Sequence, residues 1–317
     1  MILFLSLILC TSMVHTFPST NRTEEWEVWK NKFMKTYKTQ EIEQMKKVKW
    51  IENLLFVQTH RQQSSGFDVE MNMFADLSVH DLLATNLETV NAHQHQPNYV
   101  SEVDGQTNIP KSWDWRKHGV VGPVHNQGEI NDALSIAATD CVESLGAVTR
   151  GSLSRLSQQE TYECCTIHQP VPDVFQCIHS LGGLCSESDY PKHIGNGTCH
   201  SKMCQPKVKV NGSKHVIKAN ETDLQLAVLK TPVLVYFDAS HASFMLYKSG
   251  IYSEPACKST VLDHVLVLVG YGTMGQGRDF WICKNSWGIN WGMEGYVLVQ
   301  RNHDNMCGIA SKASYPV

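Results

Sequence analysis

Cysteine is the residue type through which this sequence offers most chemistry. Eleven cysteines are present, and all but Cys10 follow an apolar N-terminal run. That is more than a cytosolic enzyme usually carries, and it suits disulfides in an oxidising compartment. The spacing contains no Cys-x-x-Cys pair and no cluster of cysteines and histidines of the kind that binds zinc. We therefore expect disulfides, and neither a metal site nor a cofactor.

The N-terminus predicts entry into the secretory route. Residues 1–10 are almost all apolar and residues 11–20 turn polar, which is the length of a signal-peptide core rather than of a spanning helix. We expect cleavage near Thr16; a buried N-terminal helix is the alternative, because no positive side chain precedes the run. Sequons for N-glycosylation occur at Asn21, Asn196, Asn211 and Asn220. The expected destination is extracellular or lysosomal.

Composition narrows the possible functions. The 317 residues, 42% hydrophobic and 18% charged, can bury a substantial core. The formal net charge is −4, and no block of lysines and arginines or basic amphipathic stretch occurs. We therefore expect neither nucleic acid nor a membrane as a partner.

The elements that must position functional side chains begin with a helical N-terminal segment. An aromatic side chain recurs every three or four residues, at Trp26, Trp29, Phe33 and Tyr37. This spacing predicts an aromatic stripe along one helix face. A second helix is predicted from Glu41 to His60, and a strand and turn from Gly66 to Leu77.

A larger body follows a polar connector. Residues 86–108 are rich in Asn, Gln, His and Ser, as expected of an exposed segment that a protease could cut, so we place a boundary near Asn108. Beyond it, the pattern predicts a helix from Ala133 to Thr149 and then short strands such as Val233–Tyr236 and Val265–Val269. A helix followed by strands favours an α+β body of two packed lobes.

Three short motifs in this body resemble those of papain-like cysteine proteases. The run Asn285-Ser286-Trp287-Gly288 is similar to the asparagine-bearing motif of that family. Leu262-Asp263-His264 resembles its catalytic-histidine strand, and Val124-His125-Asn126-Gln127-Gly128 resembles its oxyanion-hole glutamine. The three motifs also follow one another in the family's order.

Both ends of the chain extend the resemblance to cathepsin L-like zymogens. The residues Asn72, Phe74 and Asp76 are similar to their short propeptide motif, and Cys307 to Pro316 is close to the cathepsin L ending. The resemblance implies a papain-like α+β fold with a helical left lobe and a β-barrel-like right lobe, behind a mainly helical inhibitor-type propeptide. The implied domains are a signal peptide (1–16), a propeptide (17–107) and a peptidase domain (108–317).

By this resemblance, three of the family's four catalytic residues have counterparts in the chain, and the fourth has none. In such an enzyme a helix-terminal cysteine is activated by a histidine, which an asparagine orients, while a glutamine helps to bind the oxyanion. These last three roles fall on His264, Asn285 and Gln127, whereas the nucleophile position falls on Ala133. A methyl group cannot attack a carbonyl, so we expect no working protease.

Three neighbours of Ala133 carry side chains that could in principle replace the nucleophile. Ser135 lies about 200° further round the expected helix, so its hydroxyl should face away from His264. Asp132 is nearer, but carboxylate attack on a peptide has no precedent in the family. Cys141 is expected to be a small core residue.

The expected substrate cleft also departs from the family. Residues from Cys165 to Leu181 contain no glycine, although the family's substrate-binding wall is glycine-rich there. At the floor of the main specificity pocket, where the family has a small apolar residue, stands Lys312. Its cation either favours an acidic partner or extends to solvent. Trp287 is expected to cover the pair formed by His264 and Asn285.

Two disulfides are implied by the family alone, Cys164–Cys199 and Cys257–Cys307. Four further cysteines could pair in three ways, namely Cys165, Cys177, Cys185 and Cys204. Cys283 is expected to be a buried thiol.

The leading functional hypothesis is a secreted, monomeric relative of cathepsin L without catalysis. It would bind a protein or peptide ligand in the former substrate cleft, as well as its own propeptide. The alternative from the enzyme class is a residual hydrolase that uses His264 and Asn285 with Asp132 or a water. A third hypothesis is a structural protein that reuses a stable disulfide-bonded fold and self-assembles.

Overall fold

The computed structural model describes residues 22–63, 65–83, 109–128, 132–166, 173–192 and 197–317. The helices are α1 (Arg22–Lys32), α2 (Gln40–Gln62), α3 (Ala133–Arg150), α4 (Gln158–Thr161), α5 (Val174–Ser180), α6 (Glu221–Val228) and α7 (Ala242–Met245). The strands are β1 (Phe67–Val69), β2 (Trp113–Asp114), β3 (Ser213–His215), β4 (Val233–Phe237), β5 (Tyr247–Tyr252), β6 (His264–Met274), β7 (Arg278–Lys284), β8 (Tyr296–Gln300) and β9 (Ala313–Pro316).

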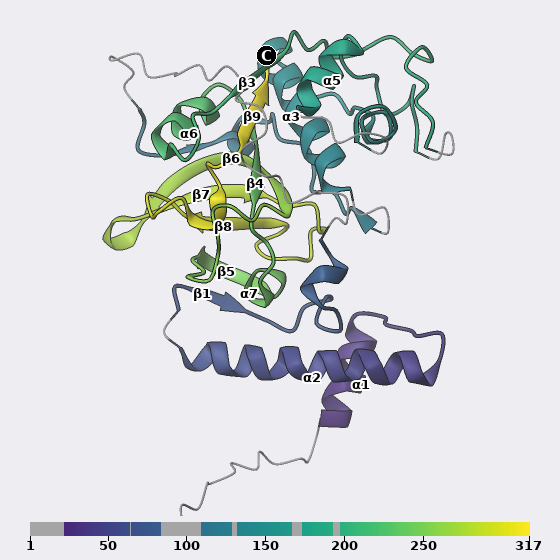
Figure 1. Cartoon of the computed structure of the whole chain (residues 1–317), viewed down its shortest axis with the longest axis vertical. Helices are drawn as coiled ribbons and strands as arrows, with labels where there is room; N and C mark the ends of the chain where they lie inside the picture. Colours follow the sequence, from purple (N-terminus) through teal and green to yellow (C-terminus); the bar gives the residue numbers. More distant parts are fainter. Residues whose placement is uncertain (1–21, 64, 84–108, 129–131, 167–172, 193–196) are drawn as a thin grey trace, which may run out of the picture.

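The strands of the described residues join in the order β1-β5-β8-β7-β6-β4-β9-β3, with β2 beside β6. Figure 1 shows three layers along the long axis of the molecule: α1 and α2 at one end, the sheet in the middle, and α3 with α5 at the other end. The long β-branched run of β6 is buried on both faces because α3 packs against it. This arrangement confirms the predicted α+β class.

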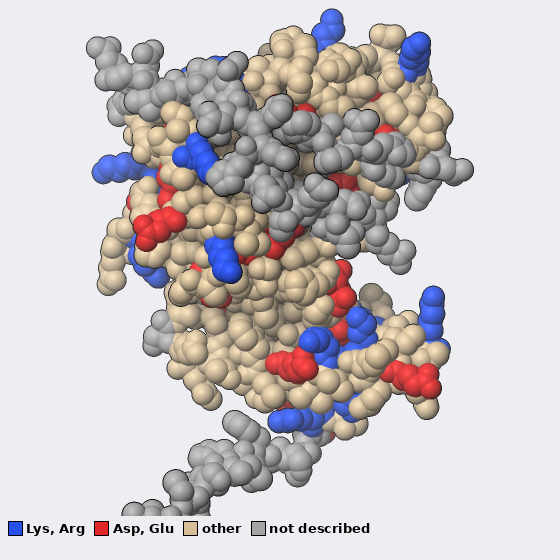
Figure 2. All heavy atoms as spheres, in the orientation of Figure 1, with Lys and Arg blue, Asp and Glu red and all other residues tan. Residues whose placement is uncertain are grey.

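The N-terminal segment is held together by the predicted aromatic residues. Trp26 stacks on Trp29 at a centroid distance of 5.3 Å and meets Trp50 of α2 edge to face at 5.6 Å. Charged side chains of both signs alternate on the outer surface of these helices, as the lower part of Figure 2 shows. Pairs such as Lys49–Glu52 are exposed and contribute little to stability.

One part of the predicted stripe was wrong. The helix α1 ends at Lys32, so Phe33 and Tyr37 lie beyond it. Met34 adopts a left-handed conformation with φ 50°, which reverses the chain before α2 begins. Tyr37 nevertheless returns to stack on Trp26 at 5.9 Å. The spacing therefore identified two buried and two partly buried aromatics but assigned too many of them to one helix.

The N-terminal segment is pinned to the sheet by backbone pairing and by buried amides. Strand β1 pairs antiparallel with β5. The amide of Asn53 on α2 donates to the carbonyls of Ala75 and Leu77, at 2.8 Å and 3.0 Å. The amide of Asn72 donates to the Met245 carbonyl at 2.8 Å. These contacts place residues 72–83 along the surface that carries the candidate site.

The helix α3 ends with well-formed caps. Asp132 is the N-cap residue, and Gly151, with φ 76°, is the C-cap residue. The predicted helix over 133–149 is therefore confirmed to within one residue. None of the described helices combines the length and the apolar character that a membrane crossing requires.

Candidate active site

Ala133 is the first residue of α3 and is completely buried. The preceding Asp132 uses both carboxylate oxygens: Oδ1 accepts from the Ser135 amide at 3.2 Å and Oδ2 from the Thr166 hydroxyl at 2.6 Å. The Ser135 hydroxyl turns back to the Asp132 carbonyl at 3.3 Å. Both proposed substitutes are thus engaged in capping the helix, where an acidic side chain is favourable.

His264 begins strand β6 and pairs with Phe237 of β4. One ring nitrogen, Nε2, lies 2.8 Å from Asn285 Oδ1. That oxygen also accepts from the Ser286 amide at 2.8 Å, so Nε2 must be the protonated nitrogen. In the neutral ring, Nδ1 then carries a lone pair, and it has no hydrogen-bond partner among the described residues. The residues predicted to hold each other, His264 and Asn285, are in contact.

Aromatic side chains cover this pair from outside. The ring of Trp287 lies 5.0 Å from the His264 ring, and Trp287 is only 1% exposed. Phe244 meets Trp287 edge to face at 5.4 Å, and Phe74 of the N-terminal segment does so at 5.9 Å. Trp287 therefore covers the histidine as predicted, and the N-terminal segment adds an outer ring to the cover.

Burial lowers the pKa of His264 to about 4, while its hydrogen bond to Asn285 acts in the opposite direction. The imidazole is therefore neutral at pH 7. A histidine in this state can accept a proton through Nδ1, but it cannot form an ion pair until a negative charge develops beside it.

This depressed pKa predicts acid sensitivity. The His264 imidazole binds a proton near pH 6.5 in the unfolded chain and near pH 4 in the folded chain. The contribution of the neutral ring to folding stability is therefore complete above pH 6.5 and is lost as the pH falls to about 4. The loss should be about 3 kcal/mol. We expect His264→Gln to flatten this part of the curve when unfolding by urea is measured at several pH values. The exposed His303→Gln is the matched control, and an unchanged slope in His264→Gln would contradict the assignment.

Gln127 lies beside the asparagine loop and contacts the N-terminal segment. Its side-chain oxygen accepts from the Ser286 hydroxyl at 2.6 Å, and its backbone amide donates to the Ser286 carbonyl at 2.8 Å. Its side-chain Nε2 donates to the Leu82 carbonyl at 3.1 Å. The sequence suggested Gln127 Nε2 as a donor to an oxyanion. In this structure that donor is already hydrogen-bonded to a backbone carbonyl of the same chain.

Lys312 neither extends freely into solvent nor pairs with an acid among the described residues. Its Nζ lies 4.2 Å from the centroid of the Tyr236 ring, a cation–π contact. Burial lowers the pKa of Lys312, and the charge of Asp173 acts in the opposite direction. The Asp173 carboxylate is itself held by the hydroxyl of Ser213 and by His215 Nε2. A half-buried ammonium is thus fixed in place against an aromatic ring.

A buried ion pair behind the site was not predicted from the sequence. Lys284 Nζ lies 2.7 Å from Asp140 Oδ2, and both side chains are at most 5% exposed. The pair joins α3 to the last residue of β7, directly before Asn285. A charged residue at the end of an apolar strand, and another within an apolar helix, were the signals that could have identified it.

The remaining predicted residues fall partly within the described chain. Cys164 is bonded to Cys199 and Cys257 to Cys307. The four unassigned cysteines form Cys165–Cys177 and Cys185–Cys204, while Cys141 and Cys283 are buried free thiols. Two described groups of metal-ligand type, Glu160 with Cys185 and Cys204, and Asp238 with His241 and Cys257, include cysteines that are already in disulfides.

The sequons differ in their surroundings. Asn211 is exposed. The side chain of Asn220 caps α6 by accepting from the Asp223 amide at 2.9 Å. The other two, Asn21 and Asn196, lie outside the described residues, as do the whole predicted connector (86–108) and residues 167–172 of the predicted cleft wall.

Comparisons with known proteins place this geometry in context. Residues 109–317 match the model for papain family cysteine proteases, and residues 26–82 match that for the cathepsin propeptide inhibitor domain (I29). Procathepsin L of Mus musculus is 34% identical over 335 residues, which cover 100% of this chain and 99% of the relative. Cathepsin J of Rattus norvegicus is 33% identical over 331 residues, covering 98% and 97%.

Solved structures agree with these relatives. The digestive procathepsin L 3 of the Tenebrio molitor larval midgut superposes with a TM-score of 0.80 at 30% identity, covering 94% of this chain and 99% of that one. The recombinant stem bromelain precursor superposes with a TM-score of 0.81 at 28% identity, covering 93% and 98%.

Proposed function

Because this chain belongs to the papain family of cysteine proteases and carries that family's cathepsin-type propeptide, we propose that it is a member without catalysis that acts by binding. Its ligand is a protein or peptide that occupies the former substrate cleft once the propeptide has left. The observation that carries the proposal is a buried methyl group, Ala133, at the first position of α3. A nucleophilic cysteine is required there for covalent catalysis.

Two further observations support the loss of activity. Asp132 and Ser135 are engaged in capping α3 and so are not free to attack a carbonyl. The two described free thiols, Cys141 and Cys283, are buried, and burial raises the pKa of each. A buried protonated thiol is a poor nucleophile.

Maturation and delivery of the chain would follow the pattern of a secreted proenzyme. We propose a signal peptide over residues 1–16, a propeptide over 17–107 and a binding domain over 108–317, with secretion or lysosomal delivery and glycans on the sequons. Without its own nucleophile, the chain depends on another protease for a cut near Asn108. Until then, the contacts of Leu82 with Gln127 and of Phe74 with Trp287 keep the cleft covered.

Absence of turnover is the first test. We expect the purified chain to hydrolyse no member of a broad peptide library, both intact and after an added protease has removed the propeptide and has then been inhibited. The competing possibility is a residual hydrolase, because the His264–Asn285 pair is intact. Turnover that disappears in His264→Ala would establish that alternative and overturn the proposal.

Lys312 predicts the chemistry of the ligand. Its half-buried ammonium contacts Tyr236. The charge of Asp173 acts on it without forming a hydrogen bond in the described chain, so an acidic ligand side chain would form a charged hydrogen bond there. We expect peptides selected from a library by the propeptide-free domain to carry Asp or Glu. Lys312→Met should weaken their binding by about tenfold, while the exposed Lys230→Met leaves it unchanged. Equal affinity for acidic peptides and their amides would contradict this assignment.

A further inference from the structure

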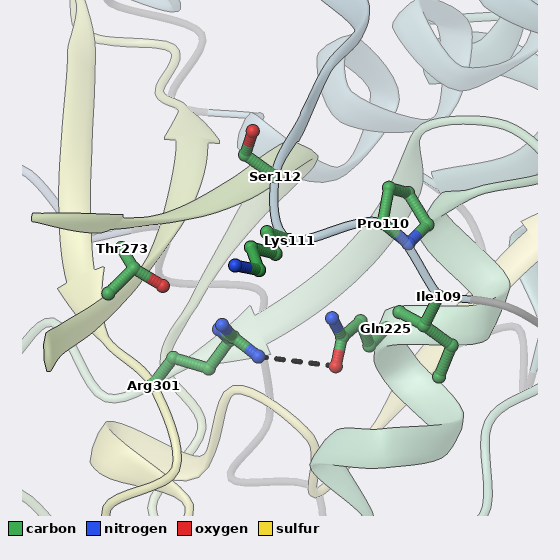
Figure 3. A pocket seen from close by; sticks show the side chains of 7 residues that line it. All are labelled: Ile109, Pro110, Lys111, Ser112, Gln225, Thr273 and Arg301. Atoms are coloured by element: carbon green, nitrogen blue, oxygen red, sulfur yellow. Dashed lines mark hydrogen bonds between the residues drawn. The ribbon is translucent and has the colours of Figure 1, made fainter.

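A separate cavity of about 540 Å³ opens where the described C-terminal domain begins. Figure 3 shows that the segment from Ile109 to Ser112 forms one wall, and that Arg301, Gln225 of α6 and Thr273 of β6 face it. None of its lining residues is acidic, two are cationic, and Ile109 with Pro110 makes one end apolar. This volume lies within the range of pockets for small organic ligands.

Arg301 is the buried charged residue of this cavity, since it is only 8% exposed. Its guanidinium packs against the rings of Tyr271 and Trp281, at 5.1 Å and 5.4 Å. One terminal nitrogen donates to Gln225 Oε1 at 3.2 Å, the contact that Figure 3 marks with a dashed line. The buried Nε has no hydrogen-bond partner among the described residues. The charge is therefore fixed in position and one donor is unused.

The carboxylate beside the cavity is already engaged. Asp279 Oδ1 lies 3.3 Å from the Arg301 guanidinium and accepts from the Thr273 hydroxyl at 2.6 Å, and Oδ2 accepts from Asn302 at 2.7 Å. Asp279 thus offsets the charge of Arg301 and leaves that of Lys111 without a counterion in the described chain.

The backbone on either side of Lys111 is fixed beside the cavity. The Tyr271 hydroxyl donates to the carbonyl of the preceding Pro110 at 2.9 Å, and Trp113 pairs with Tyr271 two residues later. The Lys111 side chain is exposed and forms no ion pair within the described residues. Figure 3 shows it reaching into the space between Thr273 and Arg301.

We propose that this cavity binds a small organic anion, a carboxylate carried on an apolar body. The carboxylate lies between Lys111 and Arg301, and the apolar body lies against Ile109 and Pro110. Planar carboxylates suit a guanidinium, and the neighbouring ammonium adds a second positive charge. The site is independent of Ala133 and of the cleft, so its occupancy does not depend on the function proposed above.

The test is a titration of the full-length chain with N-acetylphenylalanine and with its uncharged carboxamide, followed by NMR chemical shifts. We expect saturable binding of the carboxylate and none of the carboxamide. Lys111→Gln should weaken carboxylate binding by about fivefold or more, which is the effect of losing one unit charge at contact distance in a water-like medium. Lys117→Gln, an exposed lysine that does not line the cavity, should bind like the natural chain.

Because Arg301 is buried, its replacement could unfold the domain, and Lys111→Gln is the variant on which the proposal depends. Ser112→Ala is a second control on the same exposed segment: the Ser112 hydroxyl points away from Lys111 and Arg301 in Figure 3, so this variant should bind like the natural chain. Equal binding of the two probes, or carboxylate binding that Lys111→Gln leaves intact, would overturn the proposal, as would the absence of saturable binding by the natural chain.

Discussion

Ala133→Cys is expected to convert a chain that thiol-directed peptidase probes do not label into one that they label. The new thiol would stand at the N-terminal end of α3, the helix that packs against β6. Strand β6 begins with the neutral His264, whose Nδ1 has no hydrogen-bond partner among the described residues. Loss of one nucleophile from a comparable catalytic set costs roughly a million-fold in turnover. Restoring it should therefore be the largest gain that a single substitution can give.

The revertant is expected to fall short of a fully active protease, because Asp132 adds a negative charge directly beside the new thiol. A neighbouring carboxylate disfavours the thiolate and raises its pKa. We therefore expect labelling of Ala133→Cys to rise with pH, and to rise further when Asp132→Ser is added. The measurement is the rate of covalent labelling after propeptide removal by an added protease.

Two controls make this result specific. Ser135→Cys places a thiol on the same helix, where the hydroxyl now turns toward the Asp132 carbonyl, and it should remain unlabelled. His264→Ala in the revertant should abolish the gain. If Ala133→Cys is labelled no faster than Ser135→Cys, the cause of inactivity lies in the cleft rather than in Ala133.

The elements that the sequence predicted well are those with a sustained local pattern. The helix over 41–60 and that over 133–149 appear as α2 and α3, because apolar residues at helical spacing define a buried face without reference to the rest of the chain. The papain-like fold and the inhibitor-type propeptide were predicted from motifs, and the family match over 109–317 and the superposed procathepsin confirm them.

The site was predicted from motifs rather than from physical pattern. Nothing in the local sequence brings His264 to Asn285; the antiparallel pairing of β6 with β7 does so. Likewise, spacing could not show that Leu82 would reach Gln127, or that Lys312 would lie on Tyr236. These contacts join segments far apart in sequence, and they depend on strand register, which the local pattern leaves open.

Tyr37 illustrates the same limit within the propeptide. A three- or four-residue interval places side chains on one helix face only while the helix lasts, and the left-handed Met34 ends that condition. The cysteine pairing is similar: four cysteines allow three arrangements, and only the packing of α5 against the π-helix at Tyr162–Thr166 brings Cys177 to Cys165.

Asp140→Asn is expected to produce the largest loss of stability among single substitutions at the back of the site. It leaves the Lys284 ammonium buried without a negative partner, since the two groups are 2.7 Å apart and nearly inaccessible. Removal of one member of a buried pair costs about 3–5 kcal/mol. The measurement is the free energy of unfolding by urea, on the intact chain at pH 7.

A double replacement separates the pair from its surroundings. Asp140→Leu with Lys284→Met removes both charges and should recover most of the loss, because two apolar side chains avoid the cost of an isolated buried charge. The exposed pair Lys49–Glu52 is the matched control, and Glu52→Gln should change stability by less than about 1 kcal/mol. A loss below that level in Asp140→Asn would mean that the Lys284 charge is compensated elsewhere.

The same pair also bears on the geometry of the site. Lys284 is the last residue of β7 and directly precedes Asn285, so the ion pair fixes the end of that strand against α3. In the double variant the charges are gone but the packing is kept, and the His264–Asn285 hydrogen bond should persist. The bond can be followed by NMR as a downfield shift of the His264 Nε2 proton. If this shift is absent in the double variant, the bond is lost and the charge pair itself positions Asn285. If it survives, hydrophobic packing is sufficient, and the ion pair serves to join the two lobes.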